Sequence, residues 1–442
     1  VKYNMNHEVE SETLIKMKVN DEDGVNEGIY MLKDHFVIFL SQKDKVRDKN
    51  VLYAIITGKD GKQEAPVEVD AIDYKSKRNA GSFTIYPSKD LTRILVYHDE
   101  AYEKKGYERF NYKMYSQNLE LLWEKAIELP YKDSKFNVAT CRIDEEGNVF
   151  VLGTLNIDKN INQYKMFAYY TKKDRLEEVD VDFAKAYSVL SLQFDYINGH
   201  LIFVGFYTDT KRNGIQGLVY NKIHAKSLNK VVETTQPFNR EDLIKFTSEK
   251  AADKGHGLSG YYKIDHILVN ANGDIKIVAE YYYVAVHTTR GANNTTYTTY
   301  TYHYNNIMVI NLDQKGEIRW VSGIDKFQSS TNDRGTFSSY TFAYVNDDLY
   351  FLYNDHCKNT AMGETGEKKE IYGVSTQSVK NVCITLATIN AKGEVSRTLF
   401  QTLKKEDKTF FVPKQYIQLS GDRLLVYSAG SKRYKYGLLS VK

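Results

Sequence analysis

The stretch 261–321, YYKIDHILVNANGDIKIVAEYYYVAVHTTRGANNTTYTTYTYHYNNIMVINLDQKGEIRWV, has the pattern of four consecutive β-strands. Runs rich in Val, Ile and Tyr at 264–269 and 275–284 flank a turn at 270–274, and runs at 302–312 and 318–321 flank a turn at 313–317. Each turn contains Gly or Asn, which accept a positive φ, so two successive hairpins are predicted. The unit that we look for elsewhere in the chain is therefore a four-stranded antiparallel meander.

The same unit recurs along the chain of 442 residues. First-hairpin turns fall at Asp34, Asp90, Gly147, Gly199, Gly273, Asp347 and Gly421, and second-hairpin turns fall near Asp60, Asn118, Lys173, Ala225, Lys315 and Lys392. The last unit is thus one strand short, while an apolar run at 13–19, TLIKMKV, precedes the first unit without a partner. If this run supplies the missing outer strand, no sheet edge stays free to template aggregation.

The fold that this pattern predicts is all-β: a seven-bladed β-propeller of four-stranded antiparallel blades, closed by the N-terminal strand and carrying one short inserted helix. We expect a single domain over 1–442. The predicted blades cover about 26–72, 81–130, 136–184, 187–238, 261–328, 335–404 and 411–442 plus the strand 13–19, with the helical insertion at 239–255.

Three insertions interrupt the regular spacing of turns, at 237–260, 287–304 and 354–378. Each lies either between the second and third strands of a blade or between two blades. In a four-stranded meander both kinds of connection lie on the same face, so we expect all three insertions to crowd one face. Function on scaffolded folds generally resides in such loops.

The first two insertions each have a structural and a functional interpretation. The first is expected to form a helix capped by Asn239 and ended at Gly255, which packs across the top of the propeller or, alternatively, binds a partner. The second alternates Thr and Tyr and predicts a protruding hairpin with its tip at 291–294. Its Tyr rings either stack on sugars or fill a partner's pocket, or they form a ladder that only stabilises the hairpin. The third predicts a mobile lid or rim loop without a phosphate-loop pattern.

Candidate site residues lie near the insertion-bearing strand ends. The polar ring expected there comprises His98, Asp99, Asn156, Asp158, Tyr207, Asp209, Tyr282, Asp355 and His356, with Lys326, Gln328, Asn332, Asp333 and Arg334 in the connection after the fifth blade. The residues predicted to bind a partner are Tyr207, Asp209, Tyr282, Arg290, Tyr297, Tyr300, Lys326, Arg334, Asp355 and His356. No catalytic residue, metal site or cofactor is assigned, because no HExxH, GxSxG or spaced Cys/His cluster occurs.

Composition narrows the class of protein. With 60 basic and 57 acidic residues the net charge is +3, and no block of Lys and Arg indicates a nucleic-acid partner. Three cysteines cannot form a disulfide framework, and Cys141 and Cys383 are expected to be buried free thiols in apolar strands. No apolar stretch is long enough for a transmembrane helix. The chain begins at Val1, which fits removal of an export signal or trimming of the sequence for expression, and export is the favoured interpretation.

Two resemblances bear on function. The element 313–320, DQKGEIRW, is similar to the D-x-x-G-x-x-x-W element of quinoprotein-like blades, but two Trp are too few for a cofactor-binding quinoprotein. The stretches YYY at 281–283, NDRGTFSSYTFAYVNDDLYFLYND at 332–355 and RYKYGLLSVK at 433–442 resemble uncharacterised exported β-propeller proteins of Gram-negative bacteria. That resemblance covers about 258–442. It implies a periplasmic, outer-membrane-associated or secreted location and brings no activity with it.

The function that we expect is that of a non-catalytic binding or scaffold protein of the bacterial cell envelope, which engages a protein partner through the insertion-bearing face. The alternative is a carbohydrate-binding protein or carbohydrate-active enzyme that uses the same face. A structural subunit of a larger assembly is a third hypothesis.

Overall fold

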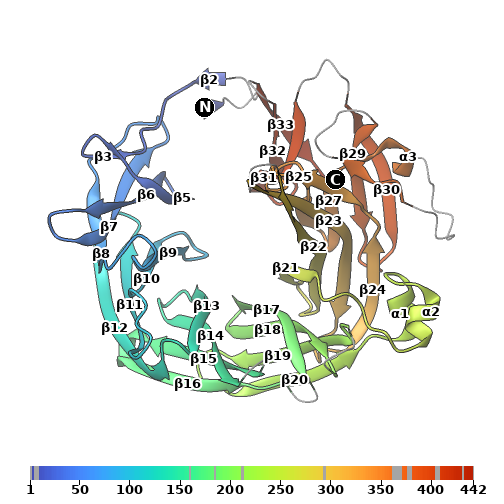
Figure 1. Cartoon of the computed structure of the whole chain (residues 1–442), viewed down its shortest axis with the longest axis horizontal. Helices are drawn as coiled ribbons and strands as arrows, with labels where there is room; N and C mark the ends of the chain where they lie inside the picture. The colour runs from blue at the N-terminus through green and yellow to red at the C-terminus, as the bar shows by residue number, and fades with distance from the viewer. Residues whose placement is uncertain are drawn as a thin grey trace. The chain divides into compact units, whose positions relative to one another are not determined.

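The computed structural model describes residues 2–3, 9–158, 161–183, 186–210, 214–291, 295–360, 371–375, 381–403, 409–430 and 433–441. Within them most residues are in β-strands, and the helices are short (Figure 1). The chain divides into two compact units. Unit 1 comprises Val1–Asp182, Phe194–Leu201 and His224–Asn229, and unit 2 comprises Phe183–Gln193, Ile202–Ile223 and Lys230–Lys442.

Unit 1 contains three four-stranded antiparallel sheets, each with its strands paired in chain order. The first is β5 (Val25–Met31), β6 (His35–Asp44), β7 (Lys49–Gly58) and β8 (Val67–Asp73). The second is β9 (Ser82–Pro87), β10 (Arg93–Asp99), β11 (Tyr107–Ser116) and β12 (Leu121–Lys132). The third is β13 (Phe136–Ile143), β14 (Val149–Asp158), β15 (Ile161–Tyr170) and β16 (Arg175–Val181), with the 3-10 helix η1 (Thr171–Lys173) between its last two strands.

A fourth sheet has residues in both units: β17 (Ser188–Ile197), β18 (His200–Thr208), β19 (Gly217–His224) and β20 (Lys230–Pro237). Unit 2 continues with β21 (Tyr262–Val269), β22 (Ile275–Arg290), β23 (Thr296–Leu312) and β24 (Ile318–Ile324), a sheet that β25 (Gln328–Thr331) and β28 (Val374–Ser375) extend. Next come β26 (Thr341–Val345), β27 (Asp348–His356), β29 (Val382–Ile389) and β30 (Val395–Thr402). The described part of the last sheet is β31 (Phe410–Ser420), β32 (Arg423–Ala429) and β33 (Tyr434–Ser440).

The predicted all-β architecture of four-stranded antiparallel units is confirmed. As expected, it rests on glycine-containing turns and on strands with apolar side chains. Turn glycines adopt the left-handed conformation where the hairpins reverse, as at Gly147 (φ 83°) and Gly273 (φ 85°). Apolar side chains from the strands form the cores. Examples from four strands are Val151 (1% exposed), Phe203 (0%), Ile277 (0%) and Leu352 (2%). The number of blades and the closure of a ring stay predictions.

The N-terminal segment does not form the predicted strand over 13–19. Residues 12–17 are not in a strand, and β3 (Lys18–Val19) pairs with β4 (Glu22–Asp23), while β1 (Lys2–Tyr3) pairs with β2 (Val9–Ser11). Ile15 and Met17 instead pack against a buried cluster that contains Ile38 and Leu40 of β6. The apolar run therefore buries its side chains on the first sheet of unit 1, which satisfies the hydrophobic pattern without a ladder of backbone hydrogen bonds.

The first insertion forms two short helices, not the single helix predicted over 239–255. Asn239 caps α1 (Arg240–Ile244) as expected, by accepting from the Asp242 N–H at 2.8 Å. Ser248 caps a second helix, α2 (Glu249–Asp253), because its side chain accepts from the Ala251 N–H and so starts a new helix. Gly255 follows with φ 69°.

These helices lie beside β24 (Figure 1), and not across the top of a propeller as predicted. The Lys245 ammonium donates to the carbonyl of Val321 at 2.7 Å, and the Phe246 ring lies against Gly323. β24 is the outer strand of its sheet and pairs only with β23. The insertion therefore covers the exposed edge of that strand.

The cysteines also differ from expectation. Cys141 is a buried free thiol as predicted, but Cys383 forms a disulfide with Cys357, across 26 positions of sequence. Cys357 begins the short helix α3 (Cys357–Thr360) directly after β27, and Cys383 lies in β29, which pairs with β27. The Cα atoms of the two cysteines are 5.1 Å apart. Two cysteines that the sequence separates by the third insertion are brought together by strand pairing. No helix in the described parts of the chain is long and apolar enough to span a membrane.

Candidate functional site

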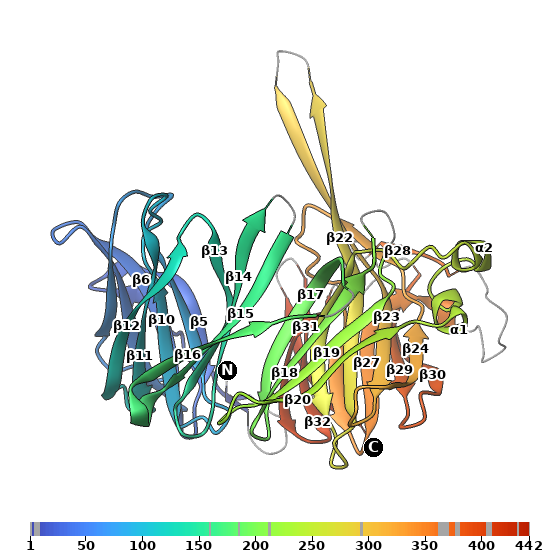
Figure 2. The same ribbon diagram turned by 90° about the horizontal axis from the view of Figure 1, so that it is seen from below.

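The second insertion is a hairpin that extends well beyond its sheet (Figure 2). β22 and β23 pair without a register shift from Tyr282–Tyr304 outward to Arg290–Thr296. Alternating Thr and Tyr side chains suit this extended, exposed geometry, and the predicted hairpin is confirmed. Of its predicted tip, 291–294, only Gly291 lies within the described residues.

The two faces of the hairpin carry different side chains, because successive residues of a strand point to opposite sides. We call one side the pocket face, since its lowest pair lines a cavity described below. Val286 and Tyr300 are its most exposed apolar residues, with 57% and 43% of their surface accessible. From base to tip the cross-strand pairs of the pocket face are Tyr282–Tyr304, Val284–Tyr302, Val286–Tyr300, Thr288–Thr298 and Arg290–Thr296.

The opposite face of the hairpin is braced by aromatic stacking. The ring of Tyr283 stacks on His303, with 4.4 Å between centroids, and on Tyr261, with 5.0 Å between centroids. Tyr261 lies at the end of the first insertion and immediately before β21. Tyr297 also belongs to this face and is 60% exposed. The first insertion therefore supports the base of the second.

The third insertion reaches the same hairpin through an added strand. β25 pairs with β23 along Thr301–Tyr304, and β28, which belongs to the third insertion, pairs with β25 in parallel. Asn332, just after β25, exchanges hydrogen bonds with Tyr300 of β23, its backbone N–H donating to the Tyr300 carbonyl and its side chain accepting from the Tyr300 N–H, both at 2.9 Å. All three insertions thus meet around β22 and β23 within unit 2.

A cavity of about 280 Å³ opens at the base of the pocket face. We call it the tyrosine pocket, because four Tyr rings lie in its wall together with charged groups from β21, β22 and β31. It is lined by Lys263, Asp265, His266, Glu280, Tyr282, Tyr304, Ser339, Tyr340, Lys414 and Tyr416. The Tyr282 and Tyr304 rings are 4.5 Å apart, so the hairpin and the pocket share one aromatic surface.

A buried network fixes the floor of the tyrosine pocket. The Lys326 ammonium donates to Glu280 Oε1 (2.7 Å), to the Tyr304 carbonyl (2.9 Å) and to Gln328 Oε1 (3.0 Å). Three acceptors use all three donors of a charged ammonium. The second oxygen of Glu280 accepts from the Ser339 hydroxyl at 2.7 Å. Glu280 is thereby held with both oxygens occupied, and Lys326, which was predicted to bind a partner, is fully buried beneath the pocket instead.

Titratable groups at the mouth of the pocket have shifted pKa values. Desolvation and the nearby Glu280 carboxylate raise the pKa of Asp265 to about 7, although this side chain keeps access to solvent. Asp265 also accepts a hydrogen bond from the Tyr340 hydroxyl at 2.6 Å. Burial lowers the pKa of His266 to about 4, and it lowers the pKa of Lys414, whose ammonium contacts the Tyr304 hydroxyl at 3.0 Å. Asp265 therefore holds a proton more readily than an ordinary carboxyl group does.

Asp355 and His356 position the third insertion and do not line the tyrosine pocket. Asp355 is fully buried and accepts from the Asn359 side chain at 2.7 Å, which in turn donates to the Tyr372 carbonyl at 2.9 Å. His356 stacks on the Tyr372 ring, with 5.2 Å between centroids. Cys357 forms the disulfide, so it does not offer a thiolate to a metal beside these residues.

The remaining predicted binding residues fall in two places. Arg290, Tyr297, Tyr300 and Arg334 are exposed on or beside the hairpin, because Gly335 packs on the Tyr304 ring and sets the preceding Arg334 next to β23. Tyr207 is buried near the end of β18, with Asp209 just beyond it, and neither lines the tyrosine pocket. Tyr282 is the one predicted binding residue in the pocket wall, and Lys326 lies below it.

Most residues that line the tyrosine pocket were not predicted from the sequence. Asp265, His266 and Glu280 stand inside apolar strand runs, IDHILV and IVAEYYY, where a charged residue interrupts the hydrophobic pattern. That interruption was the signal that could have identified them. Lys414 likewise interrupts an apolar run, FFVPK at 410–414, whereas Ser339 follows a connection rich in polar residues and carries no comparable signal.

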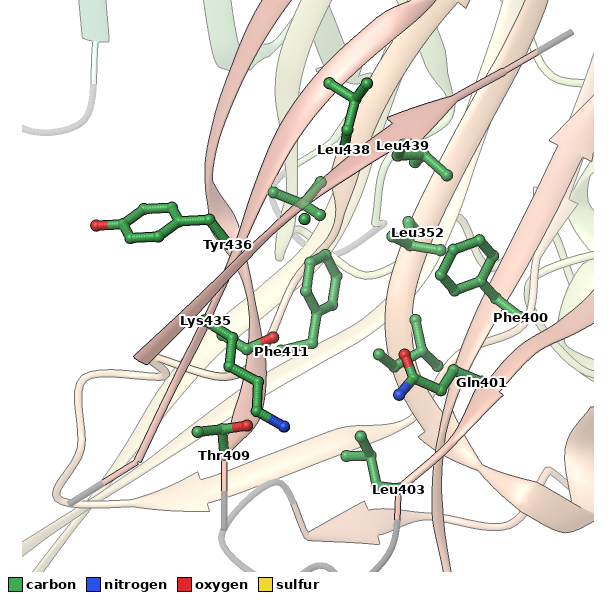
Figure 3. Close-up of a pocket in the computed structure, with 14 residues that line it drawn as sticks. Leu352, Phe400, Gln401, Leu403, Thr409, Phe411, Lys435, Tyr436, Leu438 and Leu439 are labelled. Carbon is green, nitrogen blue, oxygen red and sulfur yellow. The ribbon is translucent and has the colours of Figure 1, made fainter. Parts of the chain in front are cut away.

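A second cavity of unit 2, of about 190 Å³, lies between β30, β31 and β33 (Figure 3). Phe400 of β30, Phe411 of β31 and Leu439 of β33 are in its wall. It shares no lining residue with the tyrosine pocket, so we assign it no role in the site.

Comparisons with known proteins add little to this picture. No family model and no curated protein sequence matches the chain. Similar solved structures include the polysaccharide lyase Uly1, with 9% identity, TM-score 0.44 and coverage of 99% of this chain and 94% of that chain. The β-propeller domain of the Trilobed protease from Pyrococcus furiosus has 8% identity, TM-score 0.42 and coverage of 95% and 94%. A DUF4221 family member from Bacteroides vulgatus has 13% identity, TM-score 0.31 and coverage of 74% and 88%. At these values the similarity carries no argument about function.

Proposed function

We propose that this protein is a non-catalytic binding protein of the bacterial cell envelope, which engages a protein partner through the hairpin and the pocket at its base. The observation that carries the proposal is the exposed pair Val286 and Tyr300 on a projecting strand pair. Aromatic side chains with few rotatable bonds commonly supply much of the binding energy of an interface.

The rigidity of the hairpin base supports this role. Tyr261, Tyr283 and His303 form a continuous stack on one face, and the buried Lys326–Glu280 pair lies beneath the other. A surface that is already ordered loses little conformational entropy when a partner binds. The hairpin is therefore suited to recognition.

The disulfide Cys357–Cys383 supports the proposed export to the periplasm, the outer membrane or the medium. Disulfides form and persist in oxidising compartments and are rare in the reducing cytosol. The same bond closes the loop that contains β28, and so it helps to hold the third insertion against β25.

We also propose that the chain folds into a single seven-bladed propeller. The succession of antiparallel meanders from β5 to β33 in the described residues supports this proposal. A compact chain of this length has an expected radius of gyration of about 22 Å. Small-angle X-ray scattering that gives a clearly larger radius would contradict a single closed domain.

Photo-crosslinking tests the proposed partner surface. Tyr300→p-benzoylphenylalanine places a crosslinker on the pocket face, and Tyr102→p-benzoylphenylalanine places one on a residue of unit 1 that is 50% exposed. In extracts of the native source we expect one discrete adduct at position 300, which excess unlabelled protein competes away. The absence of that adduct, or an equal adduct at position 102, would contradict the proposal.

A second candidate function, carbohydrate binding or turnover, is favoured by the tyrosine pocket. Tyr rings stack on sugar faces, and a carboxyl group with a pKa of about 7 is suited to proton transfer at neutral pH, as Asp265 would be. A time course with acidic and neutral oligosaccharides tests this candidate, using Asp265→Asn as the comparison. Turnover by the original protein alone would replace the non-catalytic proposal. The absence of both binding and turnover would eliminate the carbohydrate candidate.

A further inference from the structure

Unit 1 contains a separate polar cavity of about 160 Å³, near the end of the β9–β12 sheet where β10 leads into β11. We call it the acidic cavity, because six of the residues that line it carry a carboxyl group. They are Asp73, Asp99, Glu100, Glu103, Glu108 and Asp133. Asp99 was expected from the sequence to lie at such a strand end, whereas Glu108 was not identified.

The two basic residues of the acidic cavity are engaged at its rim. Arg109 donates from Nε to the Glu128 carboxylate at 2.6 Å, and Glu128 lies outside the cavity. The Lys75 ammonium contacts the Ala101 carbonyl at 3.5 Å. Neither cation forms an ion pair with a carboxylate of the cavity within the described residues. Asp73 pairs with Lys49, which lies outside the cavity, at 2.7 Å, whereas in the described residues no cation pairs with Asp99, Glu108 or Asp133.

Glu108 is the central group of the acidic cavity. Its side chain is only 4% exposed and lines the cavity, and among the described residues its carboxyl group forms no ion pair. Glu108 lies on the same side of β11 as the buried Phe110, and the register against β12 shifts beside it because β12 contains the additional residues. Burial, then the carboxylates of Asp99 and Asp133, raise the pKa of Glu108 to about 8.

Burying a carboxyl group without a partner lowers the free energy of unfolding. A ligand that supplies hydrogen-bond donors and positive charge reduces this loss of stability. Within the described chain no group of three His, Cys, Asp or Glu residues is arranged to hold a metal ion. The carboxylates therefore suit a larger cation, whose N–H groups point in several directions. Tyr107 adds an aromatic wall, and its ring already accepts one ammonium, that of Lys132, at 4.0 Å from the centroid.

We propose that the acidic cavity binds an organic ammonium group, with Glu108, Asp99 and Asp133 as its acceptors. The site is independent of the hairpin and the tyrosine pocket. A free diamine and the lysine side chain of a protein offer the same chemistry, and both are used as probes. At neutral pH Glu108 binds a proton in the empty site, so binding of the cation releases that proton.

Calorimetric titration of the whole chain with 1,4-diaminobutane, and separately with Nα-acetyl-lysine amide, tests the proposal. We expect binding of at least one amine below about 1 mM. The heat should change with the ionisation enthalpy of the buffer, because a proton leaves Glu108. Tighter binding of the diamine indicates a free amine as ligand, and tighter binding of the lysine amide indicates a protein side chain.

Two variants make the test specific. Glu108→Gln resembles the protonated carboxyl group in shape and should weaken amine binding by about 10-fold or more, since a charged hydrogen bond is lost. Glu124→Gln changes an exposed carboxylate of β12 outside the cavity and should bind as the original protein does. Circular dichroism confirms that both variants are folded. No heat with either amine, equal binding by Glu108→Gln, or Ca²⁺ binding in place of amine binding would overturn the proposal.

Discussion

Glu280 of β22 and Lys326, which lies just before β25, form an ion pair with 2.7 Å between Oε1 and Nζ, and their side chains are 4% and 0% exposed. The pair joins the strand that continues into the hairpin to the segment that carries Arg334. Because the remaining donors and acceptors of both groups are occupied by Tyr304, Gln328 and Ser339, the pair behaves as one unit with the pocket floor.

Removing one partner of this pair should be strongly destabilising. Lys326→Met leaves the Glu280 charge buried without compensation, and we expect it to lower the free energy of unfolding by about 3–5 kcal/mol. Urea denaturation followed by fluorescence measures the change. Lys49→Met, which removes a solvent-exposed partner of Asp73, is the matched control and should have little effect. Equal stability of the two variants would show that the Lys326 pair has been misassigned.

The core of β18 gives a second prediction. Phe203 is 0% exposed, and Phe203→Ala should cost about 3–5 kcal/mol through lost burial and the cavity that remains. Val231→Ala, on β20 of the same sheet, removes a side chain that is 51% exposed and should change the midpoint only slightly. A denaturation midpoint of Phe203→Ala that equals that of the original protein would contradict the assigned strand faces.

The disulfide predicts the number of reactive thiols. Under denaturing and non-reducing conditions we expect one free thiol, that of Cys141, and three after reduction. Because the bond links residues 26 positions apart, reduction should lower stability by about 3–4 kcal/mol on the loop-closure model. Thiol titration and thermal melts measure both effects. Detection of three free thiols before reduction would show that the disulfide is absent. The proposed export would then lose the support that the disulfide gives it.

Glu108 predicts a pH dependence of stability with a definite sign. The folded protein keeps the Glu108 proton up to about pH 8, whereas the unfolded chain releases it near the ordinary pKa of 4.5. The stabilisation is therefore complete below the ordinary pKa and is lost as the pH rises toward about 8. Glu108→Gln should melt at the same temperature as the original protein in acid and at a higher temperature above pH 8.

The matched variant for this measurement is again Glu124→Gln, whose melting temperature should follow that of the original protein at every pH. If Glu108→Gln gains no stability above pH 8, then Glu108 is not held in its protonated form by burial.

How much of this molecule the sequence predicts depends on the range of the interactions involved. Features that depend on a few neighbouring residues were predicted correctly. They are the turn at Gly273, the helix cap at Asn239 and the hairpin with alternating Thr and Tyr. The division of the first insertion was missed because Ser248 looks like an ordinary polar residue until a helix begins after it.

The failures at longer range have a common physical cause. A hydrophobic run such as 13–19 specifies that side chains are buried but not which sheet covers them. The bond between Cys357 and Cys383 and the contact between Lys326 and Glu280 depend on strand pairing across an insertion. The tyrosine pocket collects side chains from β21, β22 and β31, which no spacing along the chain could have grouped.

The central claim is that the hairpin carries partner binding, and the affinity of a hairpin-shortened protein tests it most directly. Replacing 286–300 by a Gly-containing turn removes Val286, Tyr297 and Tyr300, with 57%, 60% and 43% of their surfaces exposed, while the pocket residues Tyr282 and Tyr304 stay in place. The partner identified by crosslinking at position 300 is titrated against the original protein, the shortened protein and Tyr434→Ala, a control at a residue of β33 that is 55% exposed. We expect the shortened protein to stay folded and to lose about 2 kcal/mol or more of binding free energy, whereas the control binds normally. Binding of the shortened protein at the original affinity would contradict the account.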